Sequence, residues 1–273
     1  MNVNKTTNRL FALTISALVL LVLPFGVSAH QRENNDEATK TVTLKVNDFN
    51  AIELEAPAIV HLYQSNEFRV ELKGTEKQIE HVSVSVDGKE LEIKKKDWRP
   101  FDIDDTKYYP EISVYMPRFK KLDVKRGGRI NVESPFSSRE MAIEASSAGH
   151  IEAPHSLKAE SIEIEASSAS SIILGNLQAE QADVEASSAA NVKLAGQALA
   201  RELKASLSSA AHLRASNWEC KRGKVKASSA GGVSVNVTEL LTGKASSGAT
   251  VMLYGKGQNE LTTSSGASIR RRN

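Results

Sequence analysis

Pairs of adjacent serines recur through the second half of this 273-residue chain at a nearly constant interval. The first serine of each pair is Ser146, Ser167, Ser187, Ser208, Ser228, Ser246 or Ser264, so successive pairs lie 18 to 21 residues apart. Self-similarity at a fixed period of this kind is the signature of a repeat architecture. The repeat therefore predicts a stack of similar coils rather than a domain built around one irregular core.

Apolar residues keep the same register as the serine pairs. Five residues after each first serine the chain has Ile151, Ile172, Val192, Leu213, Val233, Val251 and Ile269, and three residues before it Ile143, Ile164, Val184, Ala205, Val225, Gly243 and Leu261. Within each repeat apolar and polar residues alternate, which is typical of a strand whose side chains point to opposite faces. Helical repeats are longer, and the leucine and asparagine scaffold of a leucine-rich repeat is missing. We expect an all-β chain in which residues 122–273 form a parallel β-helix of about seven or eight coils, stacked ~4.8 Å apart.

The alternation also predicts where the serines point. If it continues through the pair, the first serine faces solvent and the second faces the interior, just before the coil bends. The second serines Ser147, Ser168, Ser188, Ser209, Ser229, Ser247 and Ser265 would then form an internal ladder of hydroxyl groups. A catalytic role for them is disfavoured, because seven equivalent serines have no partnering histidine.

Residues 41–121 are rich in predicted strands but show no visible repeat. Asp87 and Gly88 separate two alternating runs, which is a strong signal for a β-hairpin. Most aromatic residues lie in this half, so we expect a conventionally packed β-rich layer that caps the solenoid. The segment 122–132, with Gly127-Gly128 in place of a serine pair, resembles a degenerate first repeat whose Val124 and Val132 occupy the two apolar columns.

The first residues have the three-part pattern of a secretory signal peptide. Lys5 and Arg9 precede an apolar run from Leu10 to Leu23, and small residues end at Ala29. An uncleaved anchor is the alternative, but the run is short for ~30 Å of hydrocarbon. We predict a signal peptide at 1–29, a flexible leader at 30–40, and a mature chain without a membrane span that is exported to the periplasm, the cell surface or the extracellular space.

Composition excludes several kinds of site. The net charge of +2 is not that of a typical nucleic-acid binder, and the single cysteine, Cys220, excludes an internal disulfide and is expected to be buried. His150 and His212 share a column but lie three coils apart, ~14 Å, which is too far to share a metal ion. Asp102, Asp104 and Asp105 form an acidic loop whose closely spaced oxygen ligands would suit calcium, but it lacks the glycine and the ligand spacing of known calcium loops, which favours a solvated loop. We expect no metal, cofactor or catalytic residue.

One column of carboxylates leaves an enzymatic alternative open. Glu144, Glu165 and Glu185 stack on the outer surface at ~4.8 Å, close to the carboxylate separation of retaining glycosidases. The coils vary little in length, so little chain is left to build a substrate cleft. The column continues as Ser206, Lys226 and Lys244, which favours a solvated face.

These features together resemble a known family. The opening 49–54, the segment 60–62, the hairpin 84–93 and the Ser-Ser-Ala or Ser-Ser-Gly-Ala repeats are similar to the auto-transporter adhesin "head GIN domain" family of bacterial envelope proteins, over about residues 43–269 as one continuous domain. The resemblance implies an exported bacterial β-solenoid and supplies no catalytic residues. We expect a non-enzymatic envelope or surface protein, an adhesin or binding scaffold, whose partner is an envelope or surface glycan or protein and not a nucleic acid. The alternative is a polysaccharide hydrolase or lyase that uses Glu144, Glu165 and Glu185.

Overall fold

The computed structural model describes residues 38–96 and 106–272 of the chain, and about two-thirds of them are in strands. The strands are β1 (Lys40–Lys45), β2 (Ala51–Glu55), β3 (Ile59–Gln64), β4 (Arg69–Gly74), β5 (Val82–Asp87), β6 (Glu90–Lys95), β7 (Glu111–Met116), β8 (Lys121–Lys125), β9 (Arg129–Val132), β10 (Phe136–Ser137), β11 (Glu140–Ala145), β12 (His150–Ala166), β13 (Ser171–Ala186), β14 (Asn191–Ala195), β15 (Ala200–Leu207), β16 (His212–Ala227), β17 (Gly232–Ala245), β18 (Thr250–Tyr254), β19 (Gln258–Thr263) and β20 (Ser268–Arg271). A short helix α1 (Glu76–Glu80) and a 3₁₀ helix η1 (Thr106–Tyr108) complete the described elements.

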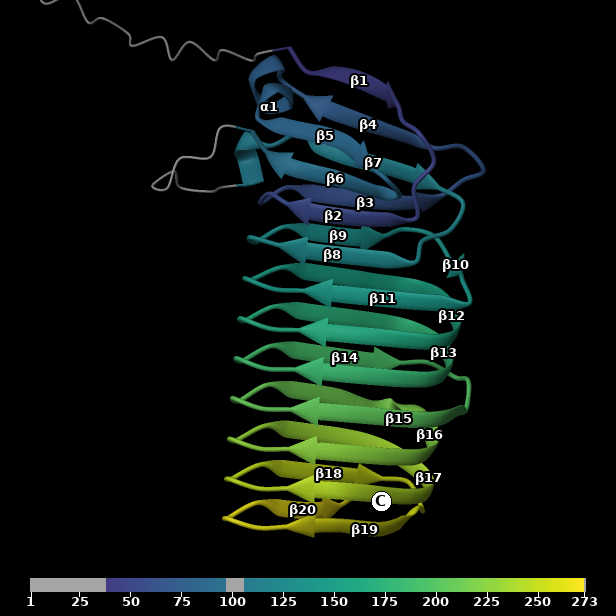
Figure 1. Cartoon of the computed structure of the whole chain (residues 1–273), viewed down its shortest axis with the longest axis vertical. Helices are drawn as coiled ribbons and strands as arrows, with labels where there is room; N and C mark the ends of the chain where they lie inside the picture. The colour runs from purple at the N-terminus through teal and green to yellow at the C-terminus, as the bar shows by residue number, and fades with distance from the viewer. Residues whose placement is uncertain (1–37, 97–105, 273) are drawn as a thin grey trace, which may run out of the picture. The chain divides into compact units, whose positions relative to one another are not determined.

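From β8 onward the strands form a parallel β-helix of about seven turns, as the repeat predicts. Each coil pairs in parallel with the next, and residues one repeat apart are partners: Ile143 pairs with Ile164, and Ile164 pairs with Val184. The long strands β12, β13, β16 and β17 bend at a corner of the coil, where β12 and β13 shift register between Ala153 and Ser156. In Figure 1 the coils follow one another down the stack, with the serine turns along its left edge.

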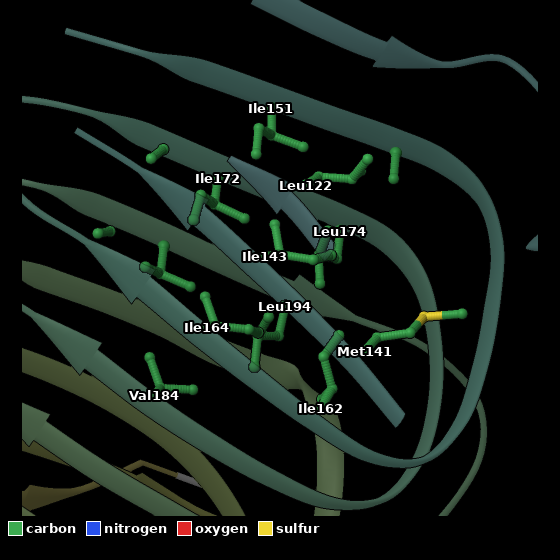
Figure 2. Close-up of a cluster of buried hydrophobic side chains, with 14 of the residues drawn as sticks. Leu122, Met141, Ile143, Ile151, Ile162, Ile164, Ile172, Leu174, Val184 and Leu194 are labelled. Carbon is green, nitrogen blue, oxygen red and sulfur yellow. The ribbon is translucent and has the colours of Figure 1, made fainter. Parts of the chain in front are cut away.

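The interior is filled by the apolar columns recognised in the sequence. Ile143, Ile164, Ile172, Leu174 and Val184 are fully buried, and Figure 2 shows such side chains from the two sides of the coil meeting in the centre. Burying one such side chain stabilises the fold by roughly 1.5–3 kcal/mol, and the same contribution recurs in coil after coil. The scarcity of aromatic residues fits this narrow interior.

The serine pairs form tight turns, and the predicted internal hydroxyl ladder is wrong. The second serine and the residue after it both have positive φ, for example 51° at Ser188 and 62° at Ala189, and the amide of Ala190 donates to the carbonyl of Ser187 at 3.1 Å. This is a type I′ turn, in which two left-handed residues reverse the chain. Side-chain alternation stops at the turn, so Ser188 and its equivalents are exposed at its tip, while the first serines through Ser246 are half-buried.

The crowded position lies two residues beyond the one expected. It is occupied by Gly149, Ser170, Ala190, Ala211, Gly231 and Ala249, all of them small and buried. A Cβ atom on Gly149 would lie 2.4 Å from the carbonyl oxygen of Val124, and the buried hydroxyl of Ser170 donates to the carbonyl of Ala145 at 2.8 Å. The small-residue requirement is therefore real, but it falls on the residue that leaves the turn.

Consecutive turns are joined by their own backbone ladder. The amide of Ala148 donates to Ser168, that of Ala169 to Ser188 and that of Ala189 to Ser209, at 2.9–3.0 Å. Left-handed conformations cost non-glycine residues about 1–2 kcal/mol each. Hydrogen bonds above and below each turn offset this cost, so serine and alanine are tolerated where an isolated turn would favour asparagine and glycine.

The parallel stack extends into the region that showed no repeat. β2 and β3 form a coil that pairs with β8 and β9 on one side and with β6 and β7 on the other. The degenerate repeat is also present, but in a register two residues away from the prediction: Val124 pairs with Ala145, and Leu122 with Ile143. The reason is the turn, in which the positive-φ residues are Arg126 and Gly127 rather than Gly128 and Arg129.

Antiparallel strands cover the N-terminal end of the stack. β5 and β6 form the hairpin predicted at Asp87-Gly88, and β4 pairs antiparallel with both β1 and β7. Phe49 packs against Phe68 with ring centroids 5.3 Å apart. The predicted β-rich cap is therefore present, and it protects a sheet edge that would otherwise be open to pairing with other chains.

Two of the sequence predictions fall outside the described residues. These are the signal peptide with most of the leader, and the acidic loop at Asp102–Asp105. Among the residues that are described, no helix is both long and apolar enough to cross a membrane.

Candidate binding face

The outward side chains of the strands that lead into the turns form the most highly charged surface of the coils. We call this surface the charged face. Its turn-side column consists of Asp123, Glu144, Glu165, Glu185, Ser206, Lys226 and Lys244. Its second column, two residues earlier on each strand, consists of Lys121, Ala142, Glu163, Asp183, Lys204, Lys224, Thr242 and Glu260. Neighbours in a column are consecutive coils, ~4.8 Å apart.

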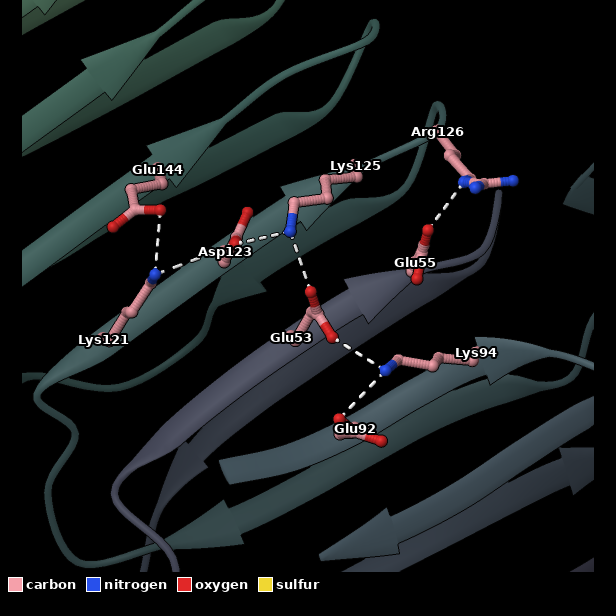
Figure 3. A network of polar contacts seen from close by, with 9 residues as sticks. All are labelled: Glu53, Glu55, Glu92, Lys94, Lys121, Asp123, Lys125, Arg126 and Glu144. Atoms are coloured by element: carbon pink, nitrogen blue, oxygen red, sulfur yellow. Dashed lines mark hydrogen bonds and ion pairs between the residues drawn. The ribbon is translucent and has the colours of Figure 1, made fainter. Parts of the chain in front are cut away.

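At the capped end the turn-side column continues as Glu53 on β2 and Glu92 on β6, and lysines neutralise its carboxylates (Figure 3). Lys94 lies 2.9 Å from Glu92 and 3.1 Å from Glu53. Lys125 lies 2.8 Å from Glu53 and 2.9 Å from Asp123, which is buried.

Lys121 continues this ladder with a contact of 2.9 Å to Glu144. Burial disfavours the charged form of Glu53, but the hydrogen bonds and charges of Lys125 and Lys94 outweigh it and lower its pKa. Each lysine thus joins carboxylates of successive coils into one network.

The ladder ends at Glu144, and the next acidic residues lack such partners. No salt bridge among residues 38–96 and 106–272 joins Glu163, Glu165, Asp183 or Glu185 to a cation. All four side chains are exposed. The pKa of Glu165 is raised, first by burial and then by the charges of Glu144, Glu163 and Glu185. This part of the face carries unneutralised negative charge.

In the following coils the charge of the face changes from negative to positive. Lys204, Lys224, Lys226 and Lys244 are exposed on the same two columns, and no salt bridge in the described part of the chain involves them. Ser206 separates the two regions in the turn-side column. The charged face therefore has an acidic half and a basic half, each about three coils long.

A shallow groove of about 680 Å³ follows the turn-side column. Its other wall is made of the half-buried first serines Ser146, Ser167, Ser187, Ser208, Ser228 and Ser246. A second groove of about 470 Å³, lined in part by Glu163, Asp183 and Lys204, lies on the far side of the second column. Both grooves present polar side chains that recur in every coil, two of them in most coils, which suits an extended partner rather than a compact small molecule.

The glutamate stack gives the enzymatic alternative no support. Glu144, Glu165 and Glu185 are brought together as predicted, but Lys121 holds Glu144 in an ion pair. Glu165 and Glu185 lie on an open face, where water is not excluded from a bound substrate. This column and its change of sign are visible in the sequence, whereas the second column and the lysine ladder were not predicted from it. The signal was present in the spacing of Lys121, Asp123 and Lys125.

The histidine and cysteine candidates lie outside the two columns of the charged face. His150 and His212 lie three coils apart, because Ser171 and Asn191 occupy the same column in the two coils between them. The described residues contain no cluster that could hold a metal ion. Burial and the nearby Arg129 lower the pKa of His150. Cys220 is fully buried, as predicted, and burial raises the pKa of its thiol to about 12.

Comparison with known proteins agrees with this architecture. Residues 48–257 match the family described as "Putative auto-transporter adhesin, head GIN domain". The chain belongs to this family. No protein with a curated description matches it.

Three solved structures illustrate the similarity to this head GIN domain chain. A "putative lipid binding protein" from Parabacteroides distasonis is 17% identical, with a TM-score of 0.78 over 87% of this chain and 98% of that chain. A "putative adhesin" from Parabacteroides merdae is 14% identical, with a TM-score of 0.76 and the same coverage. A "putative adhesin" from Bacteroides fragilis is 16% identical, with a TM-score of 0.64 over 86% of this chain and 98% of that chain. At these identities the likeness shows a shared fold.

Proposed function

We propose that this head GIN domain chain is a non-enzymatic, exported binding protein of the cell envelope or surface, and that the charged face is its binding surface. The observation that carries the proposal is the regular two-column array, in which four carboxylates and four lysines have no partners within the described chain. Charged groups left exposed and unpaired give specificity and faster encounter when a complementary partner arrives. The family description and the names of the adhesin neighbours support the same role.

The partner classes that suit this face are an envelope or surface glycan and an extended protein segment. Both offer groups repeated along a line, as the grooves do.

The test is a binding screen of the mature chain against arrays of bacterial and host surface glycans and of envelope proteins. A double variant, Lys226→Glu with Lys244→Glu, is expected to lose at least about tenfold in affinity for any ligand of the charged face. The matched control is Lys193→Glu with Arg214→Glu, which reverses two exposed charges on the strands that leave the turns. Equal binding by both double variants would show that the binding surface lies elsewhere.

A separate assay addresses catalysis. The mature chain is incubated with acidic polysaccharides, and new reducing or unsaturated ends are scored. We expect none. Product formation that Glu165→Gln abolishes would replace the binding proposal with the enzymatic one.

A further inference from the structure

The charges of the charged face form a pattern that complements itself when it is reversed. Along six consecutive coils the turn-side column has Glu144, Glu165, Glu185, Ser206, Lys226 and Lys244, and the second column has Ala142, Glu163, Asp183, Lys204, Lys224 and Thr242. When either column is laid against its own reversed copy, every carboxylate lies opposite a lysine, except that Glu185 lies opposite Ser206. The complement of this surface is therefore the same surface, turned end to end.

We propose that the charged face binds the charged face of a second copy of this chain, with the two stacks antiparallel. This inference rests on the proposed function and identifies the partner of that face. The two-fold axis lies parallel to the strands, between the coil of Glu185 and the coil of Ser206. Rotation about such an axis reverses the order of the coils but keeps each column opposite itself, and it makes an interface in which the same patch of both copies is buried.

This arrangement places a lysine opposite three carboxylates that have no cationic partner in the described part of each copy, and opposite Glu144, which Lys121 already contacts. In the turn-side column Glu144 faces Lys244 of the partner subunit, and Glu165 faces Lys226 of the partner subunit. In the second column Glu163 faces Lys224 of the partner subunit, and Asp183 faces Lys204 of the partner subunit. By symmetry each pair occurs twice. No two like charges of these columns are opposed over the six coils.

The same charges reject other arrangements. If the axis moves by half the distance between coils onto the coil of Glu185, Asp183 lies opposite Asp183 of the partner subunit. If it moves onto the coil of Ser206, Lys204 lies opposite Lys204 of the partner subunit. A parallel dimer, with its two-fold axis along the stack between the two columns, places the turn-side column opposite the second column, so that Glu165 faces Glu163 of the partner subunit and Lys226 faces Lys224 of the partner subunit. Like charges at such close range are destabilising, so the pattern specifies one orientation and one register.

The size of the face predicts a weak complex. Six coils at ~4.8 Å and strands of six residues at ~3.3 Å give a patch of about 29 by 20 Å, or about 1,200 Å² for both copies. This is at the lower limit for specific interfaces, and its contacts are exposed ion pairs that salt screens. We therefore expect reversible, salt-dependent self-association rather than a permanent dimer.

Sedimentation equilibrium of the mature chain tests the proposal with two charge-reversed variants. One carries Lys224→Glu and Lys226→Glu, and the other carries Glu163→Lys and Glu165→Lys. In each variant alone, the reversed residues face like charges of the partner subunit, so the Kd for self-association is expected to rise at least about tenfold. An equimolar mixture restores opposite charges at every pair, and we expect it to form a heterodimer with a Kd within about threefold of the wild-type value.

Two further measurements test whether association depends on the charges of this face. Wild-type association is expected to weaken at least about tenfold between 50 and 500 mM NaCl, and the control Lys193→Glu with Arg214→Glu is expected to associate as the wild type does. Rescue in the mixture also shows that both variants are folded.

Self-association of either variant alone as tight as that of the wild type, or a mixture that stays monomeric, would overturn the proposal. If the wild type is monomeric throughout while Lys226→Glu with Lys244→Glu still abolishes binding in the glycan and protein screen, the dimer is wrong and the proposed function stands.

Discussion

Gly243 provides a test in which the repeat and the structure predict opposite results. It occupies the apolar column that has Ile164, Val184, Ala205, Val225 and Leu261 in other coils. By the repeat alone, Gly243→Val fills a gap in the column and should stabilise the solenoid. In the structure Gly243 has a φ of 124°, a conformation that side chains rarely adopt, and a Cβ atom there would lie 1.9 Å from the carbonyl oxygen of Val225.

The cost follows from these two observations. Holding a non-glycine residue in such a conformation costs of order 1–3 kcal/mol. The overlap can be relieved only if β16 moves away from β17, and overpacking of this kind destabilises the fold by a further ~1–3 kcal/mol. Gly243→Val and Gly243→Ala should therefore each lower the free energy of unfolding by roughly 2–6 kcal/mol, with the larger loss for valine, whose branched side chain suits this conformation least.

Gly223 is the matched control, because it lies in the same sheet and faces the same interior. A Cβ atom on Gly223 would meet only side-chain methyl groups, those of Leu241 at 3.0 Å and Val237 at 3.1 Å, which can adjust. We expect Gly223→Ala to change stability by less than ~1 kcal/mol, since the lower entropy of its unfolded chain offsets the tight contacts. Urea unfolding followed by far-ultraviolet circular dichroism measures all three variants. A Gly243→Val protein as stable as the wild type would refute the argument and show that this coil relaxes to the regular repeat.

Three further outcomes follow from the structure. The thiol of Cys220 should not react with a thiol reagent at pH 8 until the protein unfolds, because burial raises its pKa to about 12; rapid reaction in buffer would contradict its burial. The pKa of Glu165 is raised above the ordinary 4.5, so its ionised form destabilises the fold at neutral pH and this effect disappears as the group protonates. Glu165→Gln should accordingly raise the free energy of unfolding by on the order of 0.2–0.5 kcal/mol at pH 7 and leave it unchanged at pH 3, as urea midpoints at the two pH values would show. In the turns, Ala189→Gly should change the urea midpoint little, because Gly248 and Gly266 already occupy this position, whereas the β-branched Ala189→Val should cost more than ~1 kcal/mol; equal effects would argue against the left-handed turn.

The parts of the fold that were predictable are those in which two periods coincide. Alternation along a strand and recurrence about every 20 residues together place Ile143, Ile164 and Val184 in one buried column, and the structure confirms it. The same alternation failed at Ser188, because the pair of left-handed residues in a turn ends the strand geometry on which the alternation depends.

The N-terminal coils were not predictable in the same way. Their turns lack the serine pair, and the coil of β6 and β7 stacks beyond β2 and β3 although it comes later in the chain. A search for repeats follows chain order and cannot detect this exchange. On the charged face, the glutamates were visible because they recur at the repeat interval. The lysines that neutralise Asp123 and Glu53 lie on other strands or two residues away, so only the assembled sheet reveals their contacts.

The turn-to-turn ladder gives the chain a natural unit of evolutionary change. Each turn bonds to the turns of the adjacent coils, so a duplication or deletion of one whole coil, about 20 residues, leaves the remaining turns with equivalent neighbours. Length can therefore vary in steps of ~4.8 Å at small cost in stability. Each added coil also brings its own surface charges, so a duplication that lengthens this protein changes, in the same event, the charge pattern of the face that we propose as its binding surface.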